Sequence, residues 1–133
     1  MEAHSAEAKA KADELSKRII GAAIEVHRTL GPGLLEPAYE ECLCHELALQ
    51  GVAFRRQVMI DIDYKGKLVR NAFRFDVLVE ELVIVDLKSI ERFHPIHEAQ
   101  LLTYLRLSNK WLGLMLNFNM PVLKDGIMRR VQG

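Results

Sequence analysis

The sequence has few of the residues that stabilise small secreted proteins. Only two of its 133 residues are cysteines, Cys42 and Cys44. If they lie on one helix, side chains two positions apart point roughly 200° away from each other, which suits neither a mutual disulfide nor a shared metal. We therefore expect two free thiols and a reducing, cytoplasmic environment.

Long apolar runs and an excess of one charge are also absent. No run approaches the ~18 apolar residues that cross a bilayer, and the start MEAHSAEAKAKADELSKR has no apolar signal core, so neither membrane insertion nor export is expected. Lysine plus arginine equals aspartate plus glutamate at 18 each. This balance argues against strong non-specific binding of polyanions, although a local basic rim stays open.

What the sequence does contain is enough apolar material for one hydrophobic core. Half of the residues are hydrophobic, and a chain of this length forms one domain without disulfide or metal staples. We expect a single domain over residues 1–133, with residues 1–12 as a frayed N-terminal extension.

Apolar spacing predicts helices around a β-rich middle. The expected elements are helices at 13–30 and 36–51, strands between 52 and 89, a helix at 93–107, a strand at 111–118 and a short hairpin at 122–131. This order predicts an α/β fold in which helices cover both faces of a mixed central β-sheet. His27 lies in the apolar arc of the first helix, where a core histidine bound to a backbone carbonyl is expected.

The most informative stretch is residues 75–89, FDVLVEELVIVDLKS. Two short runs rich in valine and isoleucine, joined at Glu80-Glu81, are typical of strands buried on both faces. Asp76, Asp86 and Lys88 interrupt them, and a buried charge costs several kcal/mol unless it is paired or binds a metal. Asp86 and Lys88 share one strand face, roughly 6.6 Å apart. These residues suggest a site for a hard cation with a cationic helper, although the pattern taken alone fits a surface hairpin at least as well.

Asp76 can join Asp86 only if the hairpin has the right register. A two-residue turn at Glu80-Glu81 would pair Asp76 with Val85 and leave Asp86 on the wrong face. A shared site therefore predicts an odd-length loop or a β-bulge. The alternative is a surface hairpin in which aspartate and lysine form an ordinary ion pair.

Three further polar residues are expected to point inward. Glu36 begins the second helix on the side of its apolar stripe, Tyr39, Leu43 and Leu47, although the helix dipole alone also favours an acid there. Gln100 and Tyr104 lie amid the arc of the 93–107 helix that is expected to be buried, which includes Ile96, Leu101, Leu105 and Leu107. Polar groups rarely occupy such positions without a partner.

Together, Asp76, Asp86-x-Lys88 and Gln100-x3-Tyr104 resemble the PD-(D/E)XK nuclease superfamily in the arrangement of RecB-type exonuclease domains. The segment from Gly33 to Tyr39, GLLEPAY, resembles the signature of the GxxExxY proteins, and the likeness extends from about residue 16 to the end. The resemblance implies a restriction-endonuclease-like core. Asp86 stands where glutamate is commoner, and the four cysteines of the iron–sulfur relatives are missing.

The resemblance also implies a role for each residue. Asp76 and Asp86 would hold Mg²⁺ or Mn²⁺, with the Leu87 carbonyl as a further oxygen donor, and Glu36 would complete the metal shell directly or through water. Lys88 would orient or deprotonate the attacking water. The implied catalytic set is Lys88, Asp76, Asp86, Glu36 and Gln100, with Tyr104 positioning the substrate. Gln100 and Tyr104 would position the nucleic-acid backbone or hold Lys88 in place. His27 as a metal ligand, as in certain relatives, is the alternative to the core histidine.

Two functions follow as expectations. The first is a metal-dependent nuclease that hydrolyses phosphodiester bonds of nucleic acid, with DNA favoured over RNA. The second is a non-catalytic module on a nuclease-like scaffold that binds nucleic acid or protein, which the small size and neutral charge support. The expected partners also include a second copy of the chain or another protein. The survival of every charged motif position favours the nuclease.

Overall fold

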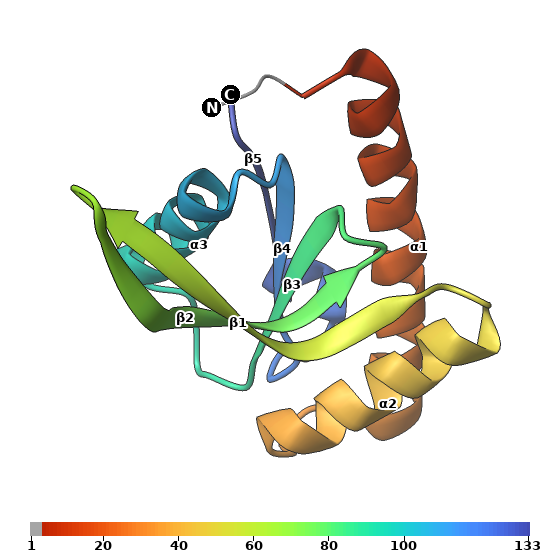
Figure 1. The fold of residues 1–133 in the computed structure, drawn as a ribbon. Helices are drawn as coiled ribbons and strands as arrows, with labels where there is room; N and C mark the ends of the chain where they lie inside the picture. The colour runs from red at the N-terminus through yellow and green to blue at the C-terminus, as the bar shows by residue number, and fades with distance from the viewer. Residues whose placement is uncertain (1–3) are drawn as a thin grey trace.

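The computed structural model describes residues 4–133 as a sheet with helices on two sides (Figure 1). The helices are α1 (Ala6–Leu30), α2 (Glu36–Leu49) and α3 (Pro95–Ser108), and a 3₁₀ turn η1 covers Leu123–Gly126. The strands are β1 (Phe54–Tyr64), β2 (Lys67–Val79), β3 (Val83–Lys88), β4 (Leu112–Asn117) and β5 (Ile127–Val131). No helix within residues 4–133 has both the length and the apolar character to span a membrane.

The sheet is mixed, as the sequence predicts. Its five strands lie in the order β1-β2-β3-β4-β5. β3 and β4 run parallel, joined by the crossover through α3, while the other neighbours pair antiparallel. The β1–β2 hairpin is the longest pair, and its far end extends away from α1 and α2 (Figure 1).

Helices cover both faces of the sheet, which confirms the predicted fold class. On one face, α1 and α2 pack against inward side chains of β2, β3 and β4. On the other face, α3 contributes Leu101 and Leu105 to two smaller clusters. Gly113 of β4 allows this close approach, because an added Cβ would lie 2.8 Å from Leu101 Cδ1.

The N-terminal prediction is wrong from Ala6 onward. α1 begins there rather than near residue 13, capped by Ser5, whose Oγ accepts a hydrogen bond from Ala8 N at 3.0 Å. Ala12 is 2% exposed and belongs to the core. An N-cap serine before an alanine-rich segment is enough to start a helix. The rest of the expected extension, residues 1–3, lies outside the described residues.

The predicted apolar stripe of the second helix is confirmed, but Glu36, which was expected to point inward on the same side, is exposed. Tyr39, Leu43 and Leu47 of α2 are fully buried. His27 of α1 is a core residue, with its Nε2 2.7 Å from the carbonyl oxygen of Met120. A histidine whose ring nitrogen is bound in this way has the partner that burial requires.

Two predictions for the C-terminal half are wrong. Ile96 and Leu107 of α3 are 69% and 42% exposed, because only Leu101 and Leu105 of this short helix face the sheet. No hairpin forms within residues 122–131. Instead η1 turns the chain, and β5 pairs with the free edge of β4.

Candidate active site

The β2–β3 hairpin has the odd-length loop that a shared aspartate site requires. Val79 lies opposite Val83, so Glu80, Glu81 and Leu82 form a three-residue loop. Glu80 and Glu81 both adopt positive φ, 49° and 59°. The last pair at the other end is Val77 with Val85, which places Asp76 across from Asp86 at the next position.

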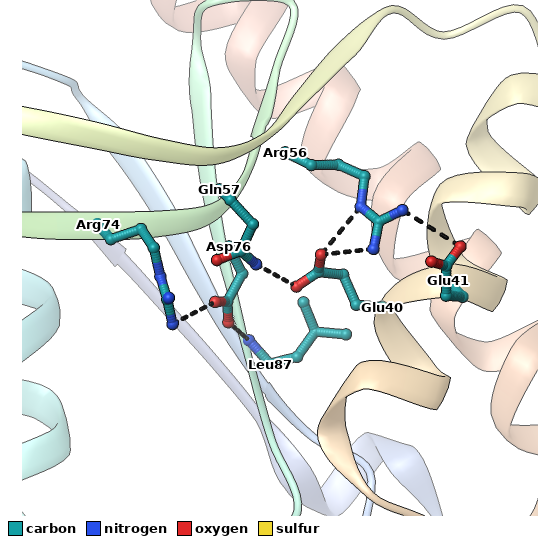
Figure 2. Close-up of polar contacts among 7 residues, drawn as sticks. All are labelled: Glu40, Glu41, Arg56, Gln57, Arg74, Asp76 and Leu87. Atoms are coloured by element: carbon teal, nitrogen blue, oxygen red, sulfur yellow. Dashed lines mark hydrogen bonds and ion pairs between the residues drawn. The ribbon is translucent and has the colours of Figure 1, made fainter.

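Beyond that pair, hydrogen bonds to the two aspartate side chains replace the backbone hydrogen bonds between β2 and β3. Asp76 N donates a hydrogen bond to Asp86 Oδ1 at 3.2 Å. Leu87 N donates to Asp76 Oδ2 at 2.9 Å, as Figure 2 shows. One oxygen of each carboxylate is thus oriented by backbone. The two acids are held rigidly at the place where the regular ladder stops.

The burial of Asp86 excludes the surface-hairpin alternative. Asp86 is 4% exposed, and burial, followed by the nearby charge of Asp76, raises the pKa of its carboxyl to about 7. Two adjacent carboxylates in a low dielectric repel each other unless a cation lies between them. This pair fits a divalent cation, because oxygen ligands with two negative charges would supply what Mg²⁺ or Mn²⁺ needs.

All six sequence-predicted residues line one cavity of about 310 Å³, named the carboxylate cavity below. Its lining consists of Glu36, Met59, Phe73, Arg74, Asp76, Asp86, Lys88, Gln100 and Tyr104. Three of these, Met59, Phe73 and Arg74, come from the β1–β2 hairpin and were not predicted. The others come from α2, β2, β3 and α3, so together with β1 five elements meet around the aspartates.

Glu36 reaches this cavity because the turn before α2 is locked. Gly33 has φ 98°, a conformation that side chains disfavour. The Tyr39 hydroxyl donates to Gly31 O at 2.6 Å and accepts from Leu34 N at 3.1 Å. The spacing Gly-x-x-Glu-x-x-Tyr therefore has a local physical meaning, in which the tyrosine fixes the turn and the turn delivers the glutamate.

The end of β3 is fastened to the same turn. Ser89 Oγ donates to Leu34 O at 2.7 Å. Asn117, buried at 1% exposure, accepts from Ile90 N and donates to Ile90 O. These bonds fix the chain directly after Lys88, so the lysine and Glu36 are set by one connected group of contacts.

The three predicted metal ligands do not form a direct three-residue shell. Among residues 4–133, no three histidine, cysteine, aspartate or glutamate side chains lie close enough to hold one ion. Glu36 starts a helix on another wall of the cavity, while the aspartates are tied to the backbone of the hairpin. Of the two predicted modes for Glu36, direct ligation has no support among residues 4–133, and contact through water stays a prediction.

Tyr104 lies on the α3 side of the cavity, close to the acids. Its ring stacks on Phe73 with centroids 4.5 Å apart and an interplanar angle of 18°. Burial, then the charges of Asp86 and Asp76, raise the pKa of its hydroxyl. The hydroxyl therefore stays protonated at neutral pH and can donate a hydrogen bond. Gln100 lies one helical turn earlier and lines the same cavity.

Sequence reasoning missed the group that fastens α2 to β1. Glu40 is 7% exposed and accepts hydrogen bonds from Arg56 Nε at 2.9 Å and Gln57 Nε2 at 2.7 Å (Figure 2). Arg56 also pairs with Glu41 at 3.2 Å. Glu40 follows Glu36 by one turn, and this inward position was the available signal. Its partners on β1 could not be found without the fold.

Comparison with protein-family models gives one finding, a match of residues 13–131 to the PD-(D/E)XK nuclease superfamily. The mixed five-stranded sheet with its three helices is consistent with a restriction-endonuclease-like fold. No curated protein and no solved structure matches the chain.

Proposed function

The chain belongs to the PD-(D/E)XK nuclease superfamily, and we propose that it is a metal-dependent nuclease that hydrolyses phosphodiester bonds of nucleic acid. Within the superfamily we place it with the GxxExxY proteins and the RecB-type arrangement, on the Gly33–Tyr39 segment and the Gln100-x3-Tyr104 spacing. We propose a cytoplasmic enzyme with DNA favoured over RNA. The observation that carries the proposal is the pair of the half-buried Asp76 and the buried Asp86 beside Lys88 in one cavity.

Asp76 and Asp86 are the proposed ligands of Mg²⁺ or Mn²⁺, with the Leu87 carbonyl as a further donor and Glu36 acting through water. Bound there, the cation supplies activation of water and shielding of phosphate charge. Support comes from Asp86, whose pKa of about 7 reflects burial and a like charge and would fall if a cation neutralised the pair.

Lys88 is the proposed catalytic cation. It follows Asp86 by two positions on β3 and lines the same cavity, so its ammonium faces the space in front of the aspartates. As an ammonium it orients the attacking water and stabilises the charge that develops on phosphorus-bound oxygens, and as a neutral amine it would accept the proton of that water. Gln100 and Tyr104, on the α3 wall, donate hydrogen bonds to the substrate backbone or hold Lys88 in position.

A non-catalytic binding module is the second candidate. The lack of a direct three-residue metal shell within the described chain and the formal net charge of zero favour it. Under this hypothesis the cavity binds a ligand without turning it over.

The test compares cleavage of single- and double-stranded DNA and RNA with Mn²⁺ by the wild type and by Lys88→Met. Methionine keeps most of the apolar stem, so folding and Mn²⁺ affinity should survive. Turnover should fall by a factor of ~10²–10³, because one group that stabilises transition-state charge contributes about that much. Lys124→Met, at an exposed lysine of η1, is the matched control and should cleave like wild type.

Equal cleavage by Lys88→Met and wild type would remove the lysine from the chemistry. No cleavage by wild type, with Mn²⁺ bound normally, would favour the binding module instead.

A further inference from the structure

A second cavity of about 620 Å³ adjoins the carboxylate cavity and is named the side cavity here. The two cavities share Glu36, Arg74 and Asp76. The side cavity then continues between the start of α2 and β1, past Leu35, Pro37 and Arg56. Nothing in the proposed chemistry uses this space, which is large enough for a nucleotide and opens beside Asp76.

The two arginines of the side cavity differ in how far their charges are already neutralised. Arg56 donates a hydrogen bond to Glu40 through Nε and forms ion pairs with Glu40 through Nη2 and with Glu41 through Nη1. The side chain of Arg74 is 56% exposed, and its ion pair with Asp76 is long, with 3.9 Å between Nη2 and Oδ1 (Figure 2). Its guanidinium, with five donors in a fixed fork, is therefore the cation available to a phosphate where the cavities meet.

The side cavity also has an apolar edge. Leu35, at the N-cap position of α2, is 79% exposed, and Pro37 follows it in the first turn. The side chain of Leu35 packs on none of the core clusters of residues 4–133. It offers an apolar surface of the kind that a base or a sugar can contact.

We propose that the side cavity is the subsite for the nucleotide next to the scissile phosphate, and that Arg74 binds the phosphate at the junction. The substrate is then a single strand, because a base stacked in a duplex cannot enter a concave site without leaving its stack. This proposal rests on the proposed nuclease function and specifies the form of its substrate.

The charges around Arg74 give the proposal a second consequence. The charge of Arg56 is neutralised by Glu40. The wall that the two cavities share therefore carries two negative charges, Glu36 and Asp76, and one positive charge, Arg74. Asp76 competes with a phosphate for the guanidinium as long as its own charge is unbalanced. Binding of an oligonucleotide through Arg74 should therefore require a divalent cation.

The experiment measures binding of short labelled oligonucleotides by fluorescence anisotropy, once in Ca²⁺ and once in EDTA. Ca²⁺ is the divalent ion chosen because it should limit turnover. Single strands should bind in Ca²⁺ and much more weakly in EDTA. Arg74→Gln should weaken binding roughly 10- to 100-fold, the range of a hydrogen bond to a charged group. Arg70→Gln, an exposed arginine of the same strand, is the control and should stay within about twofold of wild type. Leu35→Ala should weaken binding of an intact strand but not of one with an abasic site at the flanking position.

Three outcomes would overturn the proposal: equal binding by Arg74→Gln and wild type, tighter binding of a blunt duplex than of a single strand, or equal effects of Leu35→Ala on intact and abasic strands. Cleavage with Mn²⁺ is recorded in parallel. If wild type cleaves but Arg74→Gln has an unchanged KM, the subsite fails and the nuclease stands. If Arg74-dependent binding occurs without any cleavage, the subsite stands and the nuclease fails.

Discussion

Replacing Asp86 by asparagine should stabilise the metal-free protein at neutral and alkaline pH. Asp86 is 4% exposed beside Asp76, and its ionised form is disfavoured by burial first and by Asp76 second. Asparagine removes the charge but keeps the Oδ1 that accepts the Asp76 N–H. The substitution therefore isolates the electrostatic cost of this carboxylate from its hydrogen bond.

The size of the effect follows from the pKa. A rise from the ordinary value of 3.8 to about 7 corresponds to roughly 4 kcal/mol at about 1.4 kcal/mol for each tenfold change in proton affinity. Because the folded protein holds this proton more tightly than the unfolded chain, its stability falls as the pH rises from about 4 to about 7. The gain from asparagine should thus be absent near pH 4, grow through this window and level off above pH 7, at roughly 2–4 kcal/mol after allowing for coupling to Asp76.

The assay is urea unfolding of wild type and Asp86→Asn between pH 4 and pH 9 in EDTA, repeated with Mg²⁺. Mg²⁺ should stabilise the wild type at high pH and leave the variant unchanged, since only the native site binds the ion. Asp63→Asn is the control, because Asp63 is exposed and also accepts a backbone hydrogen bond, from Gly66 N. A stability difference between Asp86→Asn and wild type that does not change with pH would refute the electrostatic reasoning.

Two further variants test the metal ligands and the turn before α2. Asp76→Asn should keep the fold, because its side-chain oxygen can still accept the Leu87 N–H, and should lose Mn²⁺ binding in calorimetry; unchanged affinity would mean that Asp76 is no ligand. Tyr39→Phe removes two hydrogen bonds to the turn and should cost about 1–2 kcal/mol in urea unfolding, with reduced cleavage because Glu36 is less well placed. Tyr64→Phe, at an exposed tyrosine, should change neither quantity.

The site could be predicted where its residues obey a rule that is local in sequence. The odd-length loop at Glu80–Leu82 followed from the requirement that Asp76 and Asp86 share a face of the sheet. Because side chains alternate between the two faces of a strand, only a loop with an odd number of residues meets this requirement. The spacing of Glu36 from Leu43 and Leu47 placed it on one side of α2, and it lines the carboxylate cavity although it is exposed. In each case the distance along the chain fixes the distance in space.

The missed residues lack such a rule. Arg74 lies two positions before Asp76, but its place at the junction of two cavities depends on how α2 is laid against β1. That placement depends on Glu40 and Arg56, which are 16 positions apart in sequence. Periodicity identifies an inward side chain, but it does not identify the partner across the fold.

Gln57 indicates why the site lies where the sheet is irregular. Arg56 pairs with Val77 and Val58 with Phe75, but no pair is formed between Gln57 and Asp76. Gln57 has φ 52°, a conformation that costs roughly 1–3 kcal/mol for a residue other than glycine. Its side chain donates a hydrogen bond to the buried Glu40.

Regular pairing on both sides of Asp76 would leave its carboxylate projecting from an ordinary β-ladder. The break in the β1–β2 pairing lets Glu40 hold α2 against the strand, while Asp76 and Asp86 replace ladder bonds on the other side. The strain at Gln57 is therefore best explained as part of what holds α2, and with it Glu36, beside the cavity that the two aspartates line, rather than as a defect of the hairpin.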